Sequence, residues 1–191
     1  MGILTVENIG VVNAEGGPLL LADFRFAQSW HGAEGDSSDY QRACDALDSE
    51  PRLEGIEIPI SEGRGVLWEM EGAGTADIFR MSENHIAIVR VWPEDPLDTR
   101  AAETLALQPT AKLLELGTLV VATWVLAILW AAENGECLRL SDAVALRPSG
   151  ETAIQDSVLI LRVQKALFRC QHDKVETPSG IARRLHLFRE P

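Results

Sequence analysis

The sequence predicts a strand-dominated α+β protein with two related β-rich halves joined by a helical connector. Three observations lead to this fold class. Short apolar segments alternate with turn residues, similar segments recur in the same order in both halves, and a stretch rich in Ala, Leu and Glu separates them. A chain of 191 residues, 46 % of them hydrophobic, is long enough to bury a core. We expect a first half at 1–95, a connector at 96–116 and a second half at 117–191, packed together as one body.

Strands of the first half are indicated by alternation and by turn residues. Ile56–Ile60 alternates apolar with other side chains, Gly63 and Gly65 indicate a turn, and Val66–Met70 is the next strand. Two further strands are expected at 75–80 and 86–92, the second ending before Pro93.

Four segments of the first half have counterparts in the second half. A repeat period of roughly one hundred residues is too long for a solenoid and indicates a duplicated unit. In this alignment 33 positions separate Asp23 from Ile56 but 16 separate Asp142 from Val158, so the first half carries an insertion at about 24–55. The matched segments are Gly2–Val12 with Gly117–Ala127, Gly16–Asp23 with Gly135–Asp142, Ile56–Met70 with Ile160–Cys170, and Val89–Glu94 with Leu185–Glu190.

The insertion is expected to be partly helical, because DYQRACDAL combines an N-capping residue with apolar side chains at helical spacing. Asp39 is the expected N-cap, and the inner face comprises Tyr40, Ala43, Cys44 and Leu47. Ordered connections of this length usually serve a function.

The connector is expected to be helical over 98–116 and interrupted at Pro109. The uncharged run Leu116–Ala132 is open to three interpretations. Its Val, Ile, Thr and Trp content and the comparison of the halves favour a strand or hairpin at 119–130, with a buried core helix or a short membrane helix as alternatives. The flanks carry no cluster of Lys or Arg, which makes the membrane interpretation the weaker one.

The net charge of −12 lies in the first half. Residues 1–95 hold eighteen Asp and Glu and six Arg, whereas 117–191 hold eight Asp and Glu and nine Lys and Arg. The density is highest between Glu34 and Glu57, with eight carboxylates and two arginines. Such a field attracts basic partners and repels phosphate, so direct nucleic-acid binding is not expected.

The sequence contains no recognisable catalytic, metal or cofactor motif, and we expect neither an enzyme nor a cofactor. His31 lies near Glu34 and Asp36, and Cys170 lies two positions from His172, but neither group has the further ligands of a metal site. The glycines form no phosphate-binding loop. Three widely separated cysteines indicate a reduced protein without a disulfide framework. The first twenty residues contain no Lys or Arg, so a secretory signal is not indicated and we expect the protein to be cytoplasmic.

A protein-binding surface within the acidic segment fits these observations better. Aromatic anchors beside charged residues are typical of interface centres. Burial is the commoner fate for a large aromatic such as Trp30, whereas Tyr40 can pack its ring and expose its hydroxyl. The candidate partner-binding residues are Trp30, Glu34, Asp36, Asp39, Tyr40, Asp45, Asp48 and Glu50.

The sequence resembles the immunity protein 21 family of bacterial polymorphic toxin systems over most of its length. In the first half the resemblance rests on GGPLLLAD, Trp30-x-Gly32, DYQRACD, GIEIPISEGRGVLW and IAIVRVWPED. In the second half it rests on Trp124 and on the later GECLRLSD segment. The first-half positions that carry it include Gly16, Gly17, Pro18, Trp30, Gly32, Asp39, Tyr40, Arg42, Ala43 and Cys44.

The resemblance implies a cytoplasmic antitoxin that binds a cognate toxin and covers its active or substrate-binding surface. A toxin that acts on nucleic acid needs a basic surface, and an acidic inhibitor would take the place of the substrate's phosphates. Two alternatives stand beside it. One is an acidic inhibitor or regulator of an endogenous nucleic-acid-binding protein, and the other, ranked lower, is an uncharacterised hydrolase that uses scattered carboxylates.

Overall fold

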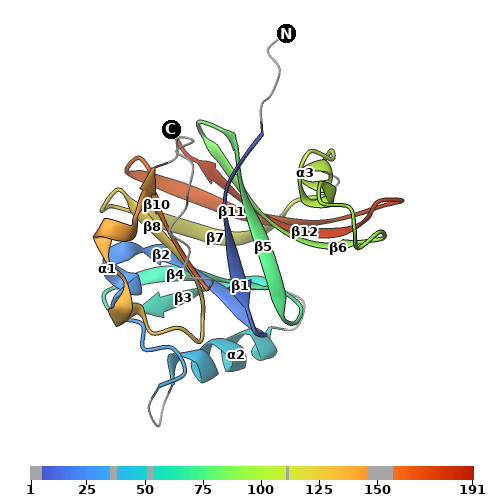
Figure 1. Ribbon diagram of the computed structural model, residues 1–191. Coiled ribbons are helices and arrows are strands. Elements are labelled where there is room, and N and C mark those ends of the chain that lie inside the picture. Colours follow the sequence, from blue (N-terminus) through green and yellow to red (C-terminus); the bar gives the residue numbers. More distant parts are fainter. Residues whose placement is uncertain (1–5, 35–37, 51–53, 111, 146–156) are drawn as a thin grey trace.

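The computed structural model describes residues 6–34, 38–50, 54–110, 112–145 and 157–191, which form two almost entirely antiparallel β-sheets with few helices (Figure 1). The predicted strand-dominated α+β class is confirmed. The strands are β1 Glu7–Ala14, β2 Pro18–Asp23, β3 Gly55–Ile60, β4 Gly63–Glu69, β5 Gly74–Ser82, β6 His85–Pro93, β7 Leu114–Val121, β8 Val125–Trp130, β9 Val144–Ala145, β10 Val158–Arg162, β11 Ala166–Thr177 and β12 Gly180–Arg189. The helices are α1 Phe24–Ala27, α2 Asp39–Ser49 and α3 Ala101–Ala106, and two 3-10 turns are η1 Gly135–Cys137 and η2 Leu140–Asp142.

Both sheets take strands from both halves of the sequence. Sheet A has the order β1-β5-β6-β12-β11-β7, and sheet B has the order β3-β4-β2-β8-β10-β9. The halves meet at the antiparallel pairs β6–β12 and β2–β8. The main apolar core lies between the sheets, where residues such as Ile88 of β6, Leu185 of β12 and Ile128 of β8 are buried.

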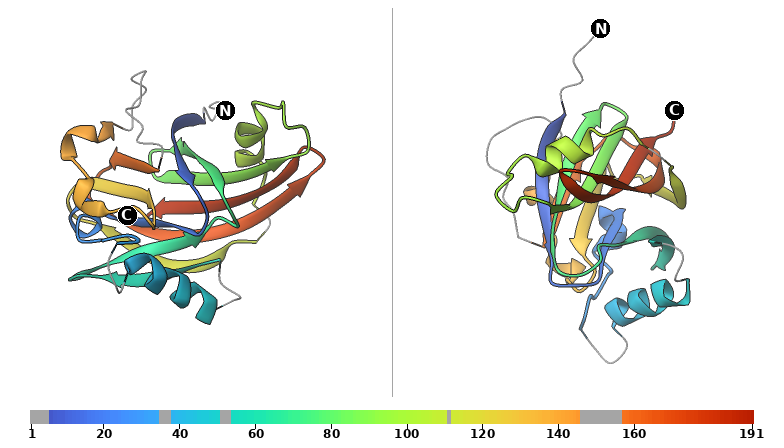
Figure 2. Two further views of the ribbon diagram at one scale, coloured as in Figure 1. Left: turned by 60° about the horizontal axis from the view of Figure 1, so that its bottom comes forward. Right: turned by 90° about the vertical axis from the view of Figure 1, so that its right-hand side faces the viewer.

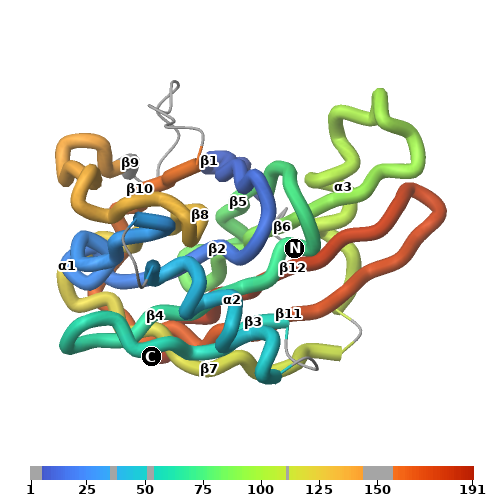
Figure 3. Tube along the Cα trace, turned by 90° about the horizontal axis from the view of Figure 1, so that it is seen from below, coloured from blue at the N-terminus to red at the C-terminus, as the bar shows by residue number. Residues whose placement is uncertain are grey.

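Helices cover the outer faces of the two sheets on opposite sides of the molecule (Figure 2). On sheet B, Leu20 and Leu129 pack with Trp30 and with Leu47 of α2. Seen from below, α2 lies beside β3 (Figure 3). On sheet A, α3 covers the side of β6 that faces away from the core, so alternate residues of this strand are buried on each face. This double burial explains the continuous apolar pattern of 86–89.

The connector is helical over a shorter stretch than predicted. Among the described residues of the connector, only Ala101–Ala106 forms a helix. β7 begins at Leu114, so the last residues of the predicted connector belong to a strand of the second half. The apolar run Leu116–Ala132 forms most of β7 and all of β8, and the core-helix and membrane-helix alternatives are wrong. The two strands belong to different sheets and therefore do not form a hairpin. Among the described residues, no helix is long and apolar enough to cross a membrane.

The turn between β3 and β4 lies two residues before the predicted position. Ser61, at φ +51°, forms the turn, while Gly63 and Gly65 pair within the sheet with Ile60 and Ile58. Gly65 is needed there for space, because a Cβ would collide with the side chain of Ile60.

The proposed alignment of the two halves is also wrong in its second segment. Pro18–Asp23 is a buried strand, whereas its assigned counterpart Gly135–Asp142 contains the turns η1 and η2. The connection from β2 to β3 covers 24–54, whereas the connection from β8 to β9 covers 131–143. The acidic segment therefore lies in the longer of these two connections.

Asp23 ends β2 and is fully buried. Its carboxylate accepts hydrogen bonds from Arg25 N at 3.0 Å, Ala122 N at 2.6 Å and both N and Oγ1 of Thr123 at 2.9 and 3.0 Å. One side chain therefore caps α1 and fixes the turn between β7 and β8. A buried carboxylate is tolerated only when its oxygens are satisfied in this way.

Asp23→Ala is expected to lower the free energy of unfolding by about 3 kcal/mol, because the turn loses several charge-assisted hydrogen bonds. Asp23→Asn should lose less, since an amide oxygen can still accept. Asp48→Ala, an exposed position on α2, is the control and should change stability by no more than about 0.5 kcal/mol. Urea denaturation followed by circular dichroism measures all three. A loss below about 1 kcal/mol for Asp23→Ala would show that water replaces the carboxylate.

Candidate functional site

The start of the acidic segment is fastened to the second half by hydrogen bonds. Trp30 donates its Nε1–H to Ala131 O at 2.7 Å, and Trp30 O accepts from Gly135 N at 2.7 Å. Ala33 N donates to Ala132 O at 3.0 Å. The chain between α1 and α2 is therefore held along the residues that follow β8.

The carbonyl oxygen of Gly16 accepts hydrogen bonds from two aromatic side chains. The Tyr40 hydroxyl donates at 3.2 Å and Trp130 Nε1 donates at 2.5 Å, and the two rings meet edge to face with centroids 6.2 Å apart. Gly17, at φ +82°, leaves room for the Tyr40 hydroxyl, with which a Cβ would collide. The Gly-Gly-Pro motif thus positions the first turn of α2.

Gly32 lets the chain approach the end of β8 closely. It adopts φ +61°, and a Cβ there would collide with the carbonyl oxygens of Ala132 and Glu133. Its own carbonyl oxygen accepts from Tyr40 N at 2.9 Å. Trp30-x-Gly32 is therefore a structural motif that docks the acidic segment.

The N-cap of α2 is Ser38 rather than the predicted Asp39. The Ser38 side chain accepts from Gln41 N at 3.0 Å. Asp39 is the first helical residue, where its carboxylate accepts from His31 N at 2.8 Å and pairs with Arg42 Nη2 at 2.9 Å. On the predicted inner face, Ala43 and Leu47 are buried, and Tyr40 and Cys44 are partly buried.

The structure separates the candidate residues into exposed and structural ones. Asp45, Asp48 and Glu50 are exposed on or just after α2. Glu34 is also exposed, and its Oε2 accepts from Asn134 Nδ2 at 2.7 Å. We call Glu34, Asp45, Asp48 and Glu50 the acidic surface.

The other candidates are less available to a partner. Trp30 is 0 % exposed, so its assignment as a contact residue is wrong: its N–H finds an acceptor inside the fold and its ring joins the core. The Asp39 side chain is 13 % exposed and already bonded, and Tyr40 is partly buried. Asp36 lies outside the described residues.

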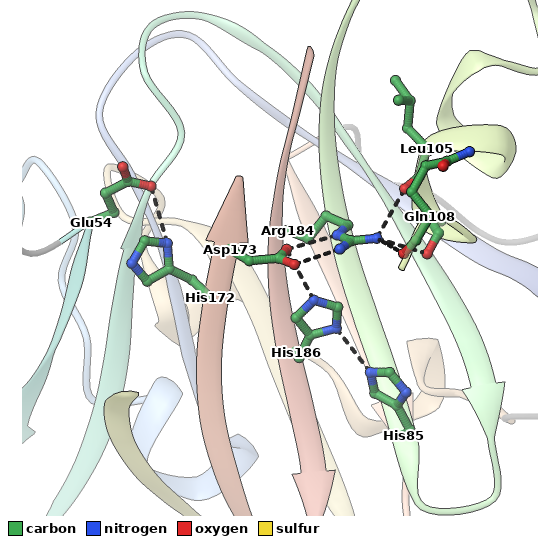
Figure 4. Close-up of polar contacts among 9 residues, drawn as sticks. Glu54, His85, Leu105, Gln108, His172, Asp173, Arg184 and His186 are labelled. Atoms are coloured by element: carbon green, nitrogen blue, oxygen red, sulfur yellow. Dashed lines mark hydrogen bonds and ion pairs between the residues drawn. The ribbon is translucent and has the colours of Figure 1, made fainter. Parts of the chain in front are cut away.

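A second polar cluster is buried on the outer face of sheet A, beneath α3 (Figure 4). Arg184 Nε donates to Asp173 Oδ1 at 2.7 Å, and Arg184 Nη1 donates to the carbonyl oxygens of Leu105 and Gln108 at 3.1 and 2.7 Å. Burial opposes ionisation of Asp173, but hydrogen bonds from Arg184 and His186 outweigh it and hold the Asp173 pKa at about 2. This ion pair attaches the end of α3 to the sheet.

The cluster continues through two histidines. His186 Nε2 lies 3.2 Å from Asp173 Oδ1, and His186 Nδ1 lies 2.9 Å from His85 Nε2. The His85 ring stacks on Phe188 with centroids 4.3 Å apart. Burial, and then the charges of His186 and Arg184, lower the pKa of His85 to about 4, so this ring is neutral near pH 7.

His172, considered above as a metal ligand with Cys170, contacts a carboxylate instead. Its Nδ1 lies 3.1 Å from Glu54 Oε2, as Figure 4 shows, and Cys170 is buried in the core between the sheets. Burial lowers the pKa of His172, and the nearby Glu54 opposes this shift. Within the described ranges, no group of three or more His, Cys, Asp and Glu could hold a metal ion.

The exposed position of Trp124 in a turn was not predicted from the sequence. The residue was assigned to a strand, but it lies in the turn between β7 and β8, 59 % exposed and at φ +67°. A bulky side chain at positive φ is strained and persists only where its surroundings impose it, here through the bonds of Asp23 to Ala122 and Thr123.

Gly32→Ala is expected to lower the free energy of unfolding by about 3 kcal/mol or more, because the methyl group meets backbone atoms that cannot move independently. Gly72→Ala is the matched control. Gly72 has φ +88°, but nothing lies within 4 Å of its added Cβ, so only the backbone strain of about 1 kcal/mol is expected. Denaturant titration of both variants separates the two contributions, and equal losses would contradict the close approach at Gly32.

Comparison with known proteins gave no match. No family model, curated protein or solved structure matches this chain.

Proposed function

We propose that the chain is an immunity protein that acts in the cytoplasm, where it binds a cognate basic toxin such as a nuclease and covers its active or substrate-binding surface. The observation that carries this proposal is the exposure of Asp45 and Asp48 on α2 and of Glu50 just after it, on a helix whose position is fixed by buried and hydrogen-bonded residues. A rigidly placed acidic helix can match a basic phosphate-binding surface with little loss of conformational entropy on binding.

The residues of the family resemblance and the acidic surface have separate roles. Trp30, Gly32 and Tyr40 hold the segment in place through buried contacts and hydrogen bonds. The carboxylates of Asp45 and Asp48 point away from that frame into solvent, since both residues are exposed on the same helix. A common frame with an exchangeable surface is what a family of inhibitors needs if its members recognise different toxins.

The acidic surface also suits long-range attraction. Exposed carboxylates in a chain of net charge −12 raise the rate at which a basic partner is encountered, and salt weakens this effect. The same surface would serve an inhibitor or regulator of an endogenous nucleic-acid-binding protein, so the identity of the partner distinguishes the two functions.

Replacing Asp45, Asp48 and Glu50 together by Lys should slow association with the toxin by about tenfold or more, and raised ionic strength should shrink this difference. The partner to use is the protein encoded by the neighbouring gene, with association measured by surface plasmon resonance and protection measured as growth during co-expression. If the wild-type chain binds this partner but expression of the partner causes no growth defect, the result would favour the regulator alternative.

A triple variant with the same charge change elsewhere is the control. Glu94, Asp142 and Glu176 are all exposed, and their replacement by Lys should reduce association much less. Circular dichroism must show that both variants fold. If both triple variants bind equally, net charge rather than the acidic surface governs recognition.

We further propose that the two halves are related copies. If each of β1 to β6 is exchanged with the strand six places later in the sequence, both sheets keep the same strand order, read from the opposite edge. The pairs β1 with β7 and β2 with β8 have equal lengths, and the second member of each follows the first by 107 positions.

Local irregularities recur at the same spacing. The bulge of β1 falls just before Gly10, and the bulge of β7 falls just before Gly117. Gly17 and Trp124 both adopt positive φ just ahead of β2 and β8. The agreement ends at β9, which runs parallel to β10 although β3 runs antiparallel to β4.

If the halves are copies, one two-fold rotation should superpose β1, β2, β4, β5 and β6 on β7, β8, β10, β11 and β12. Gly10 should then fall on Gly117, and Gly17 on Trp124. Superposition of the two halves in a crystal structure makes this measurement. A shift of register by one residue would place core side chains on the outer face and would contradict the proposal.

A further inference from the structure

A cavity of about 380 Å³ opens where sheet A meets β10 of sheet B. It is lined by the turn between β5 and β6, the connection from β10 to β11, and the last residue of β12. In Figure 1 this end of β12, next to the C-terminus, lies at the top and α2 at the bottom. The cavity is therefore separate from the acidic surface.

Three arginines, Arg80, Arg162 and Arg189, line this cavity in an otherwise acidic protein. Glu83 also lines it, and Glu7 pairs with Arg80, which leaves an excess of one positive charge. Each guanidinium has five N–H donors in a planar arrangement that matches carboxylate and phosphate oxygens.

Arg189 is oriented by neighbouring groups. Arg189 Nη1 donates to the side-chain oxygen of Gln164, which lines the same cavity. The backbone of Arg189 is fixed as well, since its N–H donates to Asn84 O at 2.9 Å. Pre-oriented guanidinium groups lose less conformational entropy when they bind an anion. Arg162 is solvent-exposed at the end of β10.

Part of the wall is apolar. Ile86, Val163 and Phe168 line the cavity and are 4, 6 and 4 % exposed, so they form the edge of the main core. In the sheet, Ile86 pairs with Arg80 and Phe168 pairs with Arg189. Each of these cross-strand pairs places an apolar side chain beside a basic one. A ligand that fills this volume would therefore contact cationic donors on one side and hydrocarbon on another.

We propose that this cavity binds a small organic anion, with a carboxylate or phosphate group held by Arg162 and Arg189 and an aromatic or aliphatic body packed on Ile86, Val163 and Phe168. The cavity volume falls within the range of about 300–1,000 Å³ that is usual for small-molecule sites. This site does not depend on the proposed immunity function, because it lies apart from the acidic surface.

The pH dependence of binding should identify the arginines as the source of positive charge. His85 also lines the cavity, but it faces His186, with Arg184 nearby, and is neutral at physiological pH. Arginine stays protonated throughout this range. Affinity for an anion that is fully ionised above about pH 5, such as benzoate, should therefore be constant between about pH 6 and 8.

Isothermal titration of the full chain with benzoate and phenyl phosphate tests the proposal and shows which head group is preferred. At least one of the two should bind about tenfold tighter than benzyl alcohol, which has the aromatic body without the anionic group, and than inorganic phosphate, which has the anionic group without the aromatic body. The double variant Arg162→Gln, Arg189→Gln should weaken this binding by about tenfold or more. Should the double variant fold poorly, Arg162→Gln alone should weaken it by about threefold or more.

The control is Arg64→Gln with Arg100→Gln, which removes the same charge at two exposed positions outside the cavity and should leave affinity within about twofold. The proposal is overturned if neither anion binds below about 10 mM, or if affinity survives in the cavity variants. Equal weakening in the control pair would also overturn it, because net charge alone would then account for binding.

Discussion

The arrangement of the molecule depends on one constraint: the buried carboxylate of Asp23 must accept hydrogen bonds. This residue ends a central strand of sheet B, caps α1, and accepts hydrogen bonds from Ala122 and Thr123 in the turn before β8. If those donors were displaced, the buried carboxylate would keep only the hydrogen bond from Arg25 N, at a cost of several kcal/mol. The link therefore sets both the junction of the two halves and the direction in which the chain enters the acidic segment.

The strands of the first half could be predicted because one or both of their faces are apolar, and this pattern is visible in sequence. The predicted strands at 56–60 and 86–92 match β3 and β6 closely. Glycines misled the prediction, because Gly65 serves close packing within a strand rather than a turn. The predicted alignment of the two halves failed where it matched the strand Pro18–Asp23 with the turns of Gly135–Asp142, since apolar side chains such as Leu and Val replace one another freely and give little information on register.

Among the candidate partner-binding residues, Glu34, Asp45, Asp48 and Glu50 are exposed, but the structural roles of Trp30 and Asp39 were not predicted. A tryptophan near charged residues suggests an interface anchor, yet Trp30 is buried because Ala131 O accepts its N–H inside the fold. Asp39 is similarly occupied by His31 and Arg42. The partner of Trp30 comes from the three-dimensional arrangement and leaves no local signal, whereas Asp39 and Arg42 pair at i, i+3 on one helix. The cavity arginines are still harder to foresee, since they are contributed by three strands that lie far apart in sequence.

The position of β12 has a consequence for biosynthesis. It is the final strand of the described chain, yet it occupies the middle of sheet A between β6 and β11. During translation, β1, β5 and β6 can pair as they emerge, but they cannot join β11 and β7 until residues up to Arg189 have left the ribosome. Until then the nascent chain exposes two unfilled sheet edges. Sheet A is thus expected to be completed only after β12 has been made, and a chain truncated before this strand would be prone to aggregation.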